Sequence, residues 1–160
     1  MNPRPEPCHL LTLRVPPLLV LAIIGTASWF GARAVAPLSF EYAAKPWVTA
    51  CFGALGLTFS LAGVASFRRA RTTVDPMRPA ATTTLIVWGV YRLTRNPMYL
   101  GFLFWLLGEI AWLAHPFALL GAPAFVLYLN RFQIAAEERA LTQRFGEAYT
   151  RYARQVPRWL

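Results

Sequence analysis

Residues 83–101, TTLIVWGVYRLTRNPMYLG, organise this chain together with a distant complement, residues 136–152, AEERALTQRFGEAYTRY. The stretch between these two polar blocks is almost uncharged and predicts a helical hairpin. A hairpin that crosses a membrane returns to the side from which it started, so both polar blocks should lie on one membrane side. The sequence therefore predicts a binding site at a membrane surface, built from both blocks.

The composition indicates a single integral-membrane domain of 160 residues. The chain is 56% hydrophobic and 14% charged, with a mean hydropathy of +0.40, whereas soluble domains carry about 25% charged residues. The net charge of +9 could indicate a nucleic-acid partner. However, the basic residues flank apolar runs, where membrane topology alone requires them. They form no stripe with aromatic residues of the kind that RNA-binding proteins use, so we expect no nucleic-acid partner.

The cysteines and histidines indicate neither a disulfide framework nor a metal site. Cys8 and Cys51 are too few for a framework of disulfides. His9 and His115 have no ligand partners at metal-binding spacing. We therefore expect no metal in the chemistry of this protein.

Four apolar stretches predict an all-α, polytopic membrane bundle. About 20 residues cross a bilayer, which places span 1 within residues 15–38 and span 2 at residues 46–67. Residues 98–130 form the hairpin of spans 3 and 4, with its turn at His115–Pro116. The second arm is short for a full span, so it is tilted or continues past Asn130. Between the two pairs of spans, residues 76–97 form a cytoplasmic connector.

The distribution of Lys and Arg predicts the topology. Of the 16 basic residues, 14 lie on one side if the chain has four spans: two in the N-terminal tail, six from Arg68 to Arg95, and six after Asn130. The positive-inside rule then places both termini in the cytoplasm, in a membrane of the bacterial inner-membrane type.

The C-terminal residues 131–160 predict an amphipathic cytoplasmic helix. Five apolar residues recur at spacings of four, four, three and four, which places them on one helical face. Such a helix lies on the membrane surface or caps the hairpin, and Gly146 weakens it locally. The five residues are Leu141, Phe145, Tyr149, Tyr152 and Val156.

Small residues in span 2 predict a close helix–helix contact. Gly53, Gly56, Ser60 and Gly63 recur at helical spacing, and small side chains at this period allow two helices to approach closely in lipid. The alternative is that these glycines are merely tolerated.

Polar residues in the two blocks are candidates for binding. Asn96–Pro97 predicts a helix start, with Asn as N-cap and Pro at the first helical position, and the N–H groups of that helix favour an anion. Glu137 and Glu138 either balance nearby arginines or bind a cation or ribose hydroxyls. Glu109 is a carboxylate inside an apolar span, which is either functional or reaches the interface.

The two blocks resemble the isoprenylcysteine carboxyl methyltransferase family, part of a wider group of integral-membrane methyltransferases that includes phospholipid N-methyltransferases. The resemblance covers residues 76–160 and is carried by GVYRLTRNPMYLG, the apolar hairpin and EERALTQRFGEAYTRYARQVPRWL, in order and at matching spacing. It implies S-adenosylmethionine as the methyl donor. The positions that match cofactor-contacting residues of the family are Thr83, Thr84, Leu85, Ile86, Tyr91, Asn96, Pro97, Met98, Tyr99 and Glu137.

Two positions depart from the eukaryotic family pattern. Asn96 stands where those members have His, and Gln133 stands where they have a substrate-facing Arg four residues before the first Glu. Arg131 is the nearest basic residue to take that substrate-facing role. Glu138 or Glu109 is the candidate base for an amine or thiol acceptor. These departures leave the acceptor open.

The sequence as a whole predicts a membrane methyltransferase that acts on a lipophilic or lipidated acceptor, with carboxyl O-methylation as the closest resemblance. Methylation of a phospholipid or another amine is the alternative within enzymes. A non-catalytic membrane protein that binds anionic lipid or a partner is the alternative from another class. The sequence does not indicate an oligomeric state.

Overall fold

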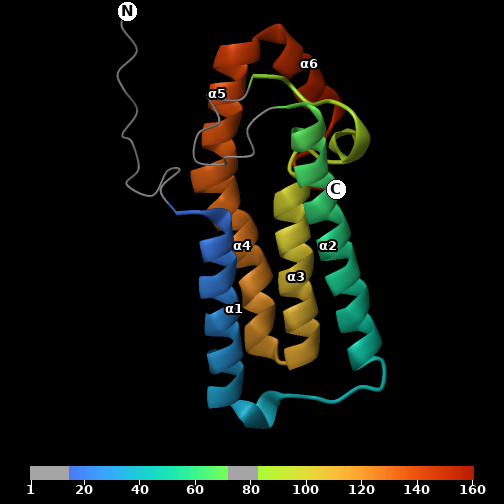
Figure 1. The fold of residues 1–160 in the computed structure, drawn as a ribbon. Coiled ribbons are helices and arrows are strands. Elements are labelled where there is room, and N and C mark those ends of the chain that lie inside the picture. Colours follow the sequence, from blue (N-terminus) through green and yellow to red (C-terminus); the bar gives the residue numbers. More distant parts are fainter. Residues whose placement is uncertain (1–14, 72–82) are drawn as a thin grey trace, which may run out of the picture.

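The computed structural model describes residues 15–71 and 83–160, and every regular element in them is helical (Figure 1). The predicted N-terminal tail, with Cys8 and His9, and residues 76–82 of the predicted connector lie outside the described residues. The longer helices are α1 Pro17–Ala34, α2 Lys45–Arg69, α3 Pro97–Leu113, α4 Gly121–Tyr128, α5 Ala135–Phe145 and α6 Glu147–Gln155. Short 3-10 turns are η1 Ala36–Leu38, η3 Gly89–Arg92 and η4 Pro116–Leu120, and η5 Leu129–Ile134 is π-helical.

The four predicted spans are present as apolar helices. The helices α1 and α2 and the continuous helical stretch Pro116–Phe145 are long and apolar enough to cross a membrane, and α3 is a shorter apolar helix. Each begins near a proline, at positions where the missing N–H of proline costs no helical hydrogen bond. The helix α3 contacts α1, α2 and α4, and the four helices stand side by side in Figure 1. The all-α, polytopic prediction is confirmed.

Small residues hold α2 against α3, as the sequence predicted. A Cβ atom on Gly101 would lie 2.3 Å from Oγ of Ser60 and 2.7 Å from the carbonyl oxygen of Gly56. Gly63 meets the start of α3 equally closely. The prediction is confirmed at Gly56, Ser60 and Gly63, whereas Gly53 faces open space.

The hairpin turns at the predicted place. Helix α3 ends at Leu113, and the next residue, Ala114, has a left-handed φ of 46°. The turn η4 begins directly after His115. The buried His115 ring accepts a hydrogen bond from the N–H of Phe117 at 3.1 Å and lies 3.0 Å from the carbonyl oxygen of Val35. His115 therefore fastens the turn to the end of α1.

The second arm of the hairpin continues past Asn130, which was one of the two alternatives. It passes from α4 through η5 into α5 without a break. The predicted single helix over 131–160 is wrong, because the chain turns at Gly146, with φ 54° and ψ −126°, and α6 follows in a new direction. A local sequence pattern does not show such a turn, since both halves keep the helical period.

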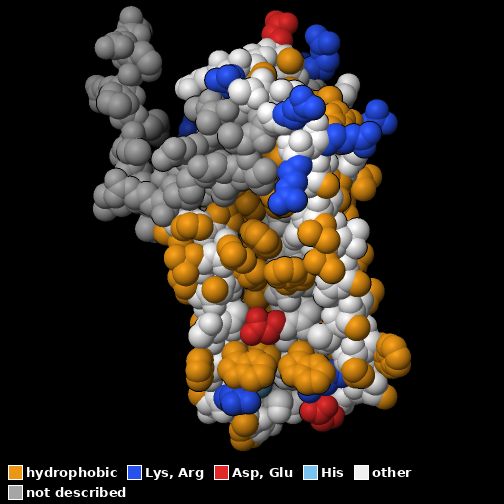
Figure 2. Space-filling view, viewed as in Figure 1, with side chains coloured by type: hydrophobic (Ala, Val, Ile, Leu, Met, Phe, Trp, Pro, Cys, Tyr) orange, Lys and Arg blue, Asp and Glu red, His pale blue; other side chains and the backbone are white. Residues whose placement is uncertain are grey.

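The predicted apolar face of the C-terminal segment nevertheless forms one cluster. Tyr149, Tyr152 and Val156 are buried with Ile86 and Tyr91, and the other predicted face residues pack against them. The C-terminal helices therefore cover residues 85–91. Figure 2 shows Lys and Arg side chains gathered at the end of the molecule that carries α5 and α6, with hydrophobic side chains dominating the middle of the visible face.

Candidate functional site

The polar centre of the candidate site joins the first turn of α3 to the junction of η5 and α5. The Tyr99 hydroxyl donates a hydrogen bond to Oε1 of Glu137. Gln133 donates from Nε2 to the same carboxylate oxygen at 2.6 Å and to the Tyr99 hydroxyl at 3.3 Å. Tyr99 and Gln133 are buried, and Glu137 is half-buried. The two predicted residues Tyr99 and Glu137, 38 positions apart, are thus in direct contact.

Glu137 is hydrogen-bonded by neutral groups. It forms no ion pair with any residue in the described part of the chain, because the partner four residues earlier is the neutral Gln133 rather than the arginine of the family pattern. Two hydrogen-bond donors, Tyr99 and Gln133, hold the carboxyl group in place. The site therefore contains a carboxyl group that no described cation neutralises.

An aromatic wall flanks this centre. The Tyr152 hydroxyl donates to the carbonyl oxygen of Tyr91 at 2.7 Å, and both rings belong to the cluster with Ile86. Burial raises the pKa of Tyr91 far above its usual range, and Tyr152 and the Glu137 carboxylate raise it further. Tyr91 is therefore a neutral hydroxyl that lies within the field of Glu137.

Glu138 faces a different set of groups from Glu137. Arg158 donates from Nε to Oε1 of Glu138 at 2.9 Å and from Nη2 to Oε2, so the contact is bidentate. Arg95 approaches Oε1 of Glu138 at 2.8 Å and also donates to the Tyr149 hydroxyl at 3.3 Å. Glu138 thus bridges two arginines. Because both of its carboxylate oxygens are occupied by guanidinium groups, these contacts weigh against the predicted role of Glu138 as a base.

The C-terminal residues fold back over the start of α3. The carbonyl oxygen of Arg158 accepts hydrogen bonds from Oγ1 of Thr94 at 2.8 Å and from Nδ2 of Asn96 at 3.0 Å. The Arg95 N–H donates to the carbonyl oxygen of Pro157 at 2.9 Å, and Trp159 donates to Asn130 at 3.2 Å. We call residues 157–159 the tail strap.

The tail strap changes the role predicted for Asn96. Asn96 occupies the N-cap position before Pro97, as predicted, but its side chain makes no capping hydrogen bond. The amide is instead directed to the strap. The N–H groups in the first turn of α3 therefore lack a side-chain cap, and the positive end of a helix dipole favours an anion.

The remaining predicted positions differ in their surroundings. Thr83 and Thr84 are exposed, and Leu85 and Ile86 pack in the aromatic cluster. The Pro97 and Met98 side chains contact the region of Gly63 on α2. Arg131 is exposed on η5.

Several residues of the site were not predicted as members. Gln133 was noted only as a departure from the family pattern, although its spacing of four from Glu137 was a usable signal. Thr94 and Arg158 had no such signal, because their partners lie far away in the sequence. Arg95 was expected only as positive charge beside the helix start at Pro97, and its contact with Glu138 was not predicted. The π-helical turn at η5 was also missed, although π turns often occur at functional sites.

Comparison with known proteins identifies the family. A profile of the phospholipid methyltransferase family matches residues 44–148, more than half of the chain. The chain belongs to the phospholipid methyltransferase family. The match includes α2, the hairpin, Glu137 and Glu138, whereas most of α6 and the tail strap lie beyond it. The resemblance stated from the sequence is confirmed.

Relatives of this phospholipid methyltransferase family member include bacterial and eukaryotic proteins. An uncharacterised protein of Haemophilus influenzae is 48% identical over 63 residues, which are 39% of this chain and the whole of that protein. A probable protein-S-isoprenylcysteine O-methyltransferase of Oryza sativa subsp. indica is 47% identical over 75 residues, or 45% of this chain. The human protein-S-isoprenylcysteine O-methyltransferase is 34% identical over 76 residues, or 48% of this chain. The matches span only 38% of the rice protein and 27% of the human protein.

Proposed function

We propose that this protein transfers a methyl group from S-adenosylmethionine to a lipophilic acceptor at the membrane. Membership in the phospholipid methyltransferase family supports the reaction class. The observation that carries the proposal is the contact of Tyr99, Gln133 and Glu137 at the uncapped start of α3. This contact places the carboxyl group of Glu137, which no described cation neutralises, beside a helix end that attracts anions. Such a pairing suits a ligand that carries both an amino group and a carboxylate.

The groups present fit the methyl donor. The N–H groups of the first turn of α3 would hold its carboxylate. Glu137 would accept hydrogen bonds from the ribose hydroxyls or pair with the amino group, and Tyr91 and Tyr99 would offer aromatic faces. The bound donor supplies an electrophilic methyl group on a sulfonium, and the protein contributes mainly by holding donor and acceptor in line.

The names of the relatives suggest the class of methyl acceptor. The rice and human relatives are named for O-methylation of protein S-isoprenylcysteine, and a carboxylate acceptor needs no base. The family name also includes phospholipids, whose amine must lose a proton before attack. Glu138 is held by two arginines and is poorly placed to act as a base. A carboxylate acceptor needs no base, so we favour a lipidated or lipophilic carboxylate as the acceptor.

The topology that suits this reaction has both termini and the tail strap in the cytoplasm. The donor is polar and enters from water, whereas the acceptor arrives from the bilayer. The basic end of the molecule in Figure 2 then faces the cytoplasm, as the positive-inside rule requires. For a bacterial protein this membrane is the inner membrane.

The proposal is tested by calorimetry of S-adenosylmethionine and its demethylated product with the protein in detergent, using wild type, Glu137→Gln and Glu147→Gln. Glu147 is an exposed carboxylate at the start of α6 and serves as the control for loss of one charge. A hydrogen bond to a charged group contributes about 1.5–3 kcal/mol, so Glu137→Gln should weaken donor binding by about tenfold to a hundredfold. Glu147→Gln should bind as wild type does.

The absence of donor binding by a folded, monodisperse wild-type sample would overturn the proposal. Equal binding by wild type and Glu137→Gln would remove Glu137 from the donor site. The acceptor class is then tested with labelled donor and membrane extracts. Product that releases methanol on base treatment is an ester, whereas base-stable product excludes a carboxylate acceptor and leaves an amine or a thiol.

A further inference from the structure

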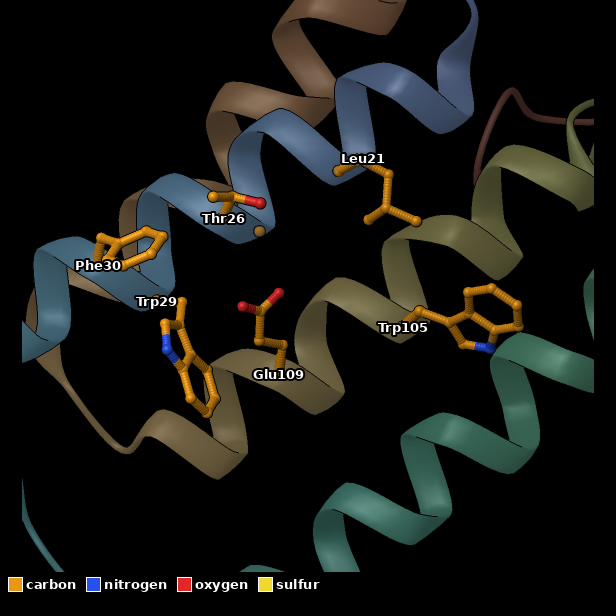
Figure 3. A pocket seen from close by; sticks show the side chains of 8 residues that line it. Leu21, Thr26, Trp29, Phe30, Trp105 and Glu109 are labelled. Carbon is orange, nitrogen blue, oxygen red and sulfur yellow. The ribbon is translucent and has the colours of Figure 1, made fainter.

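A second pocket lies at the level of the apolar spans, between α1 and α3. It has a volume of about 540 Å³, within the range of about 300–1,000 Å³ typical of small-molecule sites. Its wall is apolar and aromatic, with Trp29 on α1 and Trp105 on α3, and it contains one carboxylate, Glu109. Figure 3 shows the Glu109 carboxylate directed from α3 into the space facing α1, near Thr26 and Trp29.

The fold makes room for this carboxylate but gives it no partner. A Cβ atom on Gly25 would lie 2.6 Å from Oε2 of Glu109, so the absence of a side chain at Gly25 accommodates the carboxylate. Glu109 is half-buried and forms no hydrogen bond or ion pair with the described residues. An unpaired carboxylate among apolar groups is costly. The arrangement therefore favours a ligand that brings a positive charge or hydrogen-bond donors.

This pocket is separate from the donor site. Glu109 follows Pro97 by twelve residues on α3, and a rise of 1.5 Å per residue separates them by about 18 Å along the helix. Glu109 is one turn from the end of α3 at Leu113, and so lies toward the end of the bundle opposite the tail strap. A group held at Glu109 is therefore too far from Tyr99 and Glu137 to be the methylated atom.

A cation lies at the outer edge of the same pocket. The guanidinium carbon of Arg33, in the last turn of α1, is 4.7 Å from the centroid of the Trp29 ring, and Trp29 lines the pocket. Arg33 is exposed. The pocket thus has a carboxylate inside and a guanidinium at its edge, with an indole between them.

We propose that this pocket binds the headgroup of a membrane phospholipid that carries an ammonium group, with the ammonium at Glu109 and the phosphate toward Arg33. The carboxylate neutralises the ammonium, and the indole wall adds cation–π attraction. The acyl chains extend along the exposed apolar surface of α1, where Leu18, Leu19 and Ile23 are about half-exposed. This lipid is bound in addition to donor and acceptor, and the inference does not depend on the proposed methyl transfer.

The test is native mass spectrometry of the delipidated protein in detergent with dioleoyl phosphatidylethanolamine or dioleoyl phosphatidylglycerol. The variants are Glu109→Gln, Arg33→Gln and Glu41→Gln. Glu41 is an exposed carboxylate paired with Lys45 and controls for the loss of one negative charge. We expect wild type and Glu41→Gln to prefer the amine lipid at least fivefold. Glu109→Gln should abolish that preference, and Arg33→Gln should weaken binding of both lipids.

Other outcomes would overturn the inference. Equal retention of the two lipids by wild type, or an unchanged preference in Glu109→Gln, would show that the carboxylate does not recognise an ammonium. A lipid-independent dimer that is lost in Glu109→Gln would identify a second copy of the chain as the occupant. Competition by dodecylammonium would support the ammonium site. Glu109→Gln should bind S-adenosylmethionine with the same affinity as wild type. The lipid-binding inference can therefore be refuted without refuting the methyltransferase proposal.

Discussion

The two adjacent glutamates should respond differently to the same substitution. Glu138 accepts three N–H contacts from Arg95 and Arg158, whereas Glu137 accepts hydrogen bonds from two neutral groups. Glu138→Gln removes the only charge that compensates two guanidinium groups in this network. Glu137→Gln keeps an amide oxygen that still accepts from Tyr99.

The magnitude follows from how deeply the ion pairs are buried. The side chains of Arg95 and Glu138 are 15% and 19% exposed, and that of Arg158 is 37% exposed. Breaking a fully buried pair costs about 3–5 kcal/mol, but solvent screens the Arg158 contact, so we expect Glu138→Gln to lose about 2–3 kcal/mol of unfolding free energy. Glu137→Gln should lose less than about 1 kcal/mol.

The assay is equilibrium unfolding of the purified protein by SDS in mixed micelles, followed by tryptophan fluorescence. Donor binding is measured on the same samples. Glu138→Gln should be destabilised yet keep donor affinity within about threefold once folded, and Arg158→Gln should lose a similar stability that is not additive with it. A Glu138→Gln protein as stable as wild type would refute the structural role. If it also bound the donor but methylated nothing, Glu138 would be the base.

Two backbone substitutions test the packing of the bundle and the C-terminal turn. Gly101→Ala should cost about 1–3 kcal/mol because its Cβ meets Ser60 and Gly56 on α2. Its control, Gly53→Ala, faces open space and should be neutral or up to about 1 kcal/mol stabilising, so equal Tm values in detergent would contradict the packing. Gly146→Ala meets no neighbour but forces alanine to φ 54° and ψ −126°. We expect a loss of about 1–3 kcal/mol from backbone strain alone, and an unchanged Tm would show that the turn relaxes.

The sequence predicted those features that depend on local patterns. The lengths of the apolar stretches predicted the four helices. The structure also contains the helix start predicted at Pro97 and the turn predicted at His115–Pro116. The apolar period from Leu141 to Val156 predicted a shared face that the structure also contains. It did not predict that the chain turns at Gly146, because glycine inside a helical pattern is compatible with either outcome.

The candidate site was predicted less completely, since its contacts join distant residues. The sequence predicted that Tyr99 and Glu137 belong to one site, because the hairpin returns the chain to the same side and both positions match cofactor-contacting residues of the family. The bonds of Thr94 and Asn96 to the Arg158 carbonyl, 64 and 62 residues away, leave no periodic trace in the sequence. The capping role predicted for Asn96 was a sound local inference, but a tertiary hydrogen bond replaces it.

The π-helical segment η5 sets the direction in which Glu137 points. A π turn holds one residue more than the α-helical turn that it replaces, and each residue in an α-helix advances the direction of the side chains by about 100°. If Leu129–Ile134 became a regular α-helix with no residue removed, all of α5 would rotate by about 100° relative to α4. Glu137 would then point away from Tyr99, although every residue of the site would still be present. The site is therefore set by the number of residues in this turn as much as by their identity.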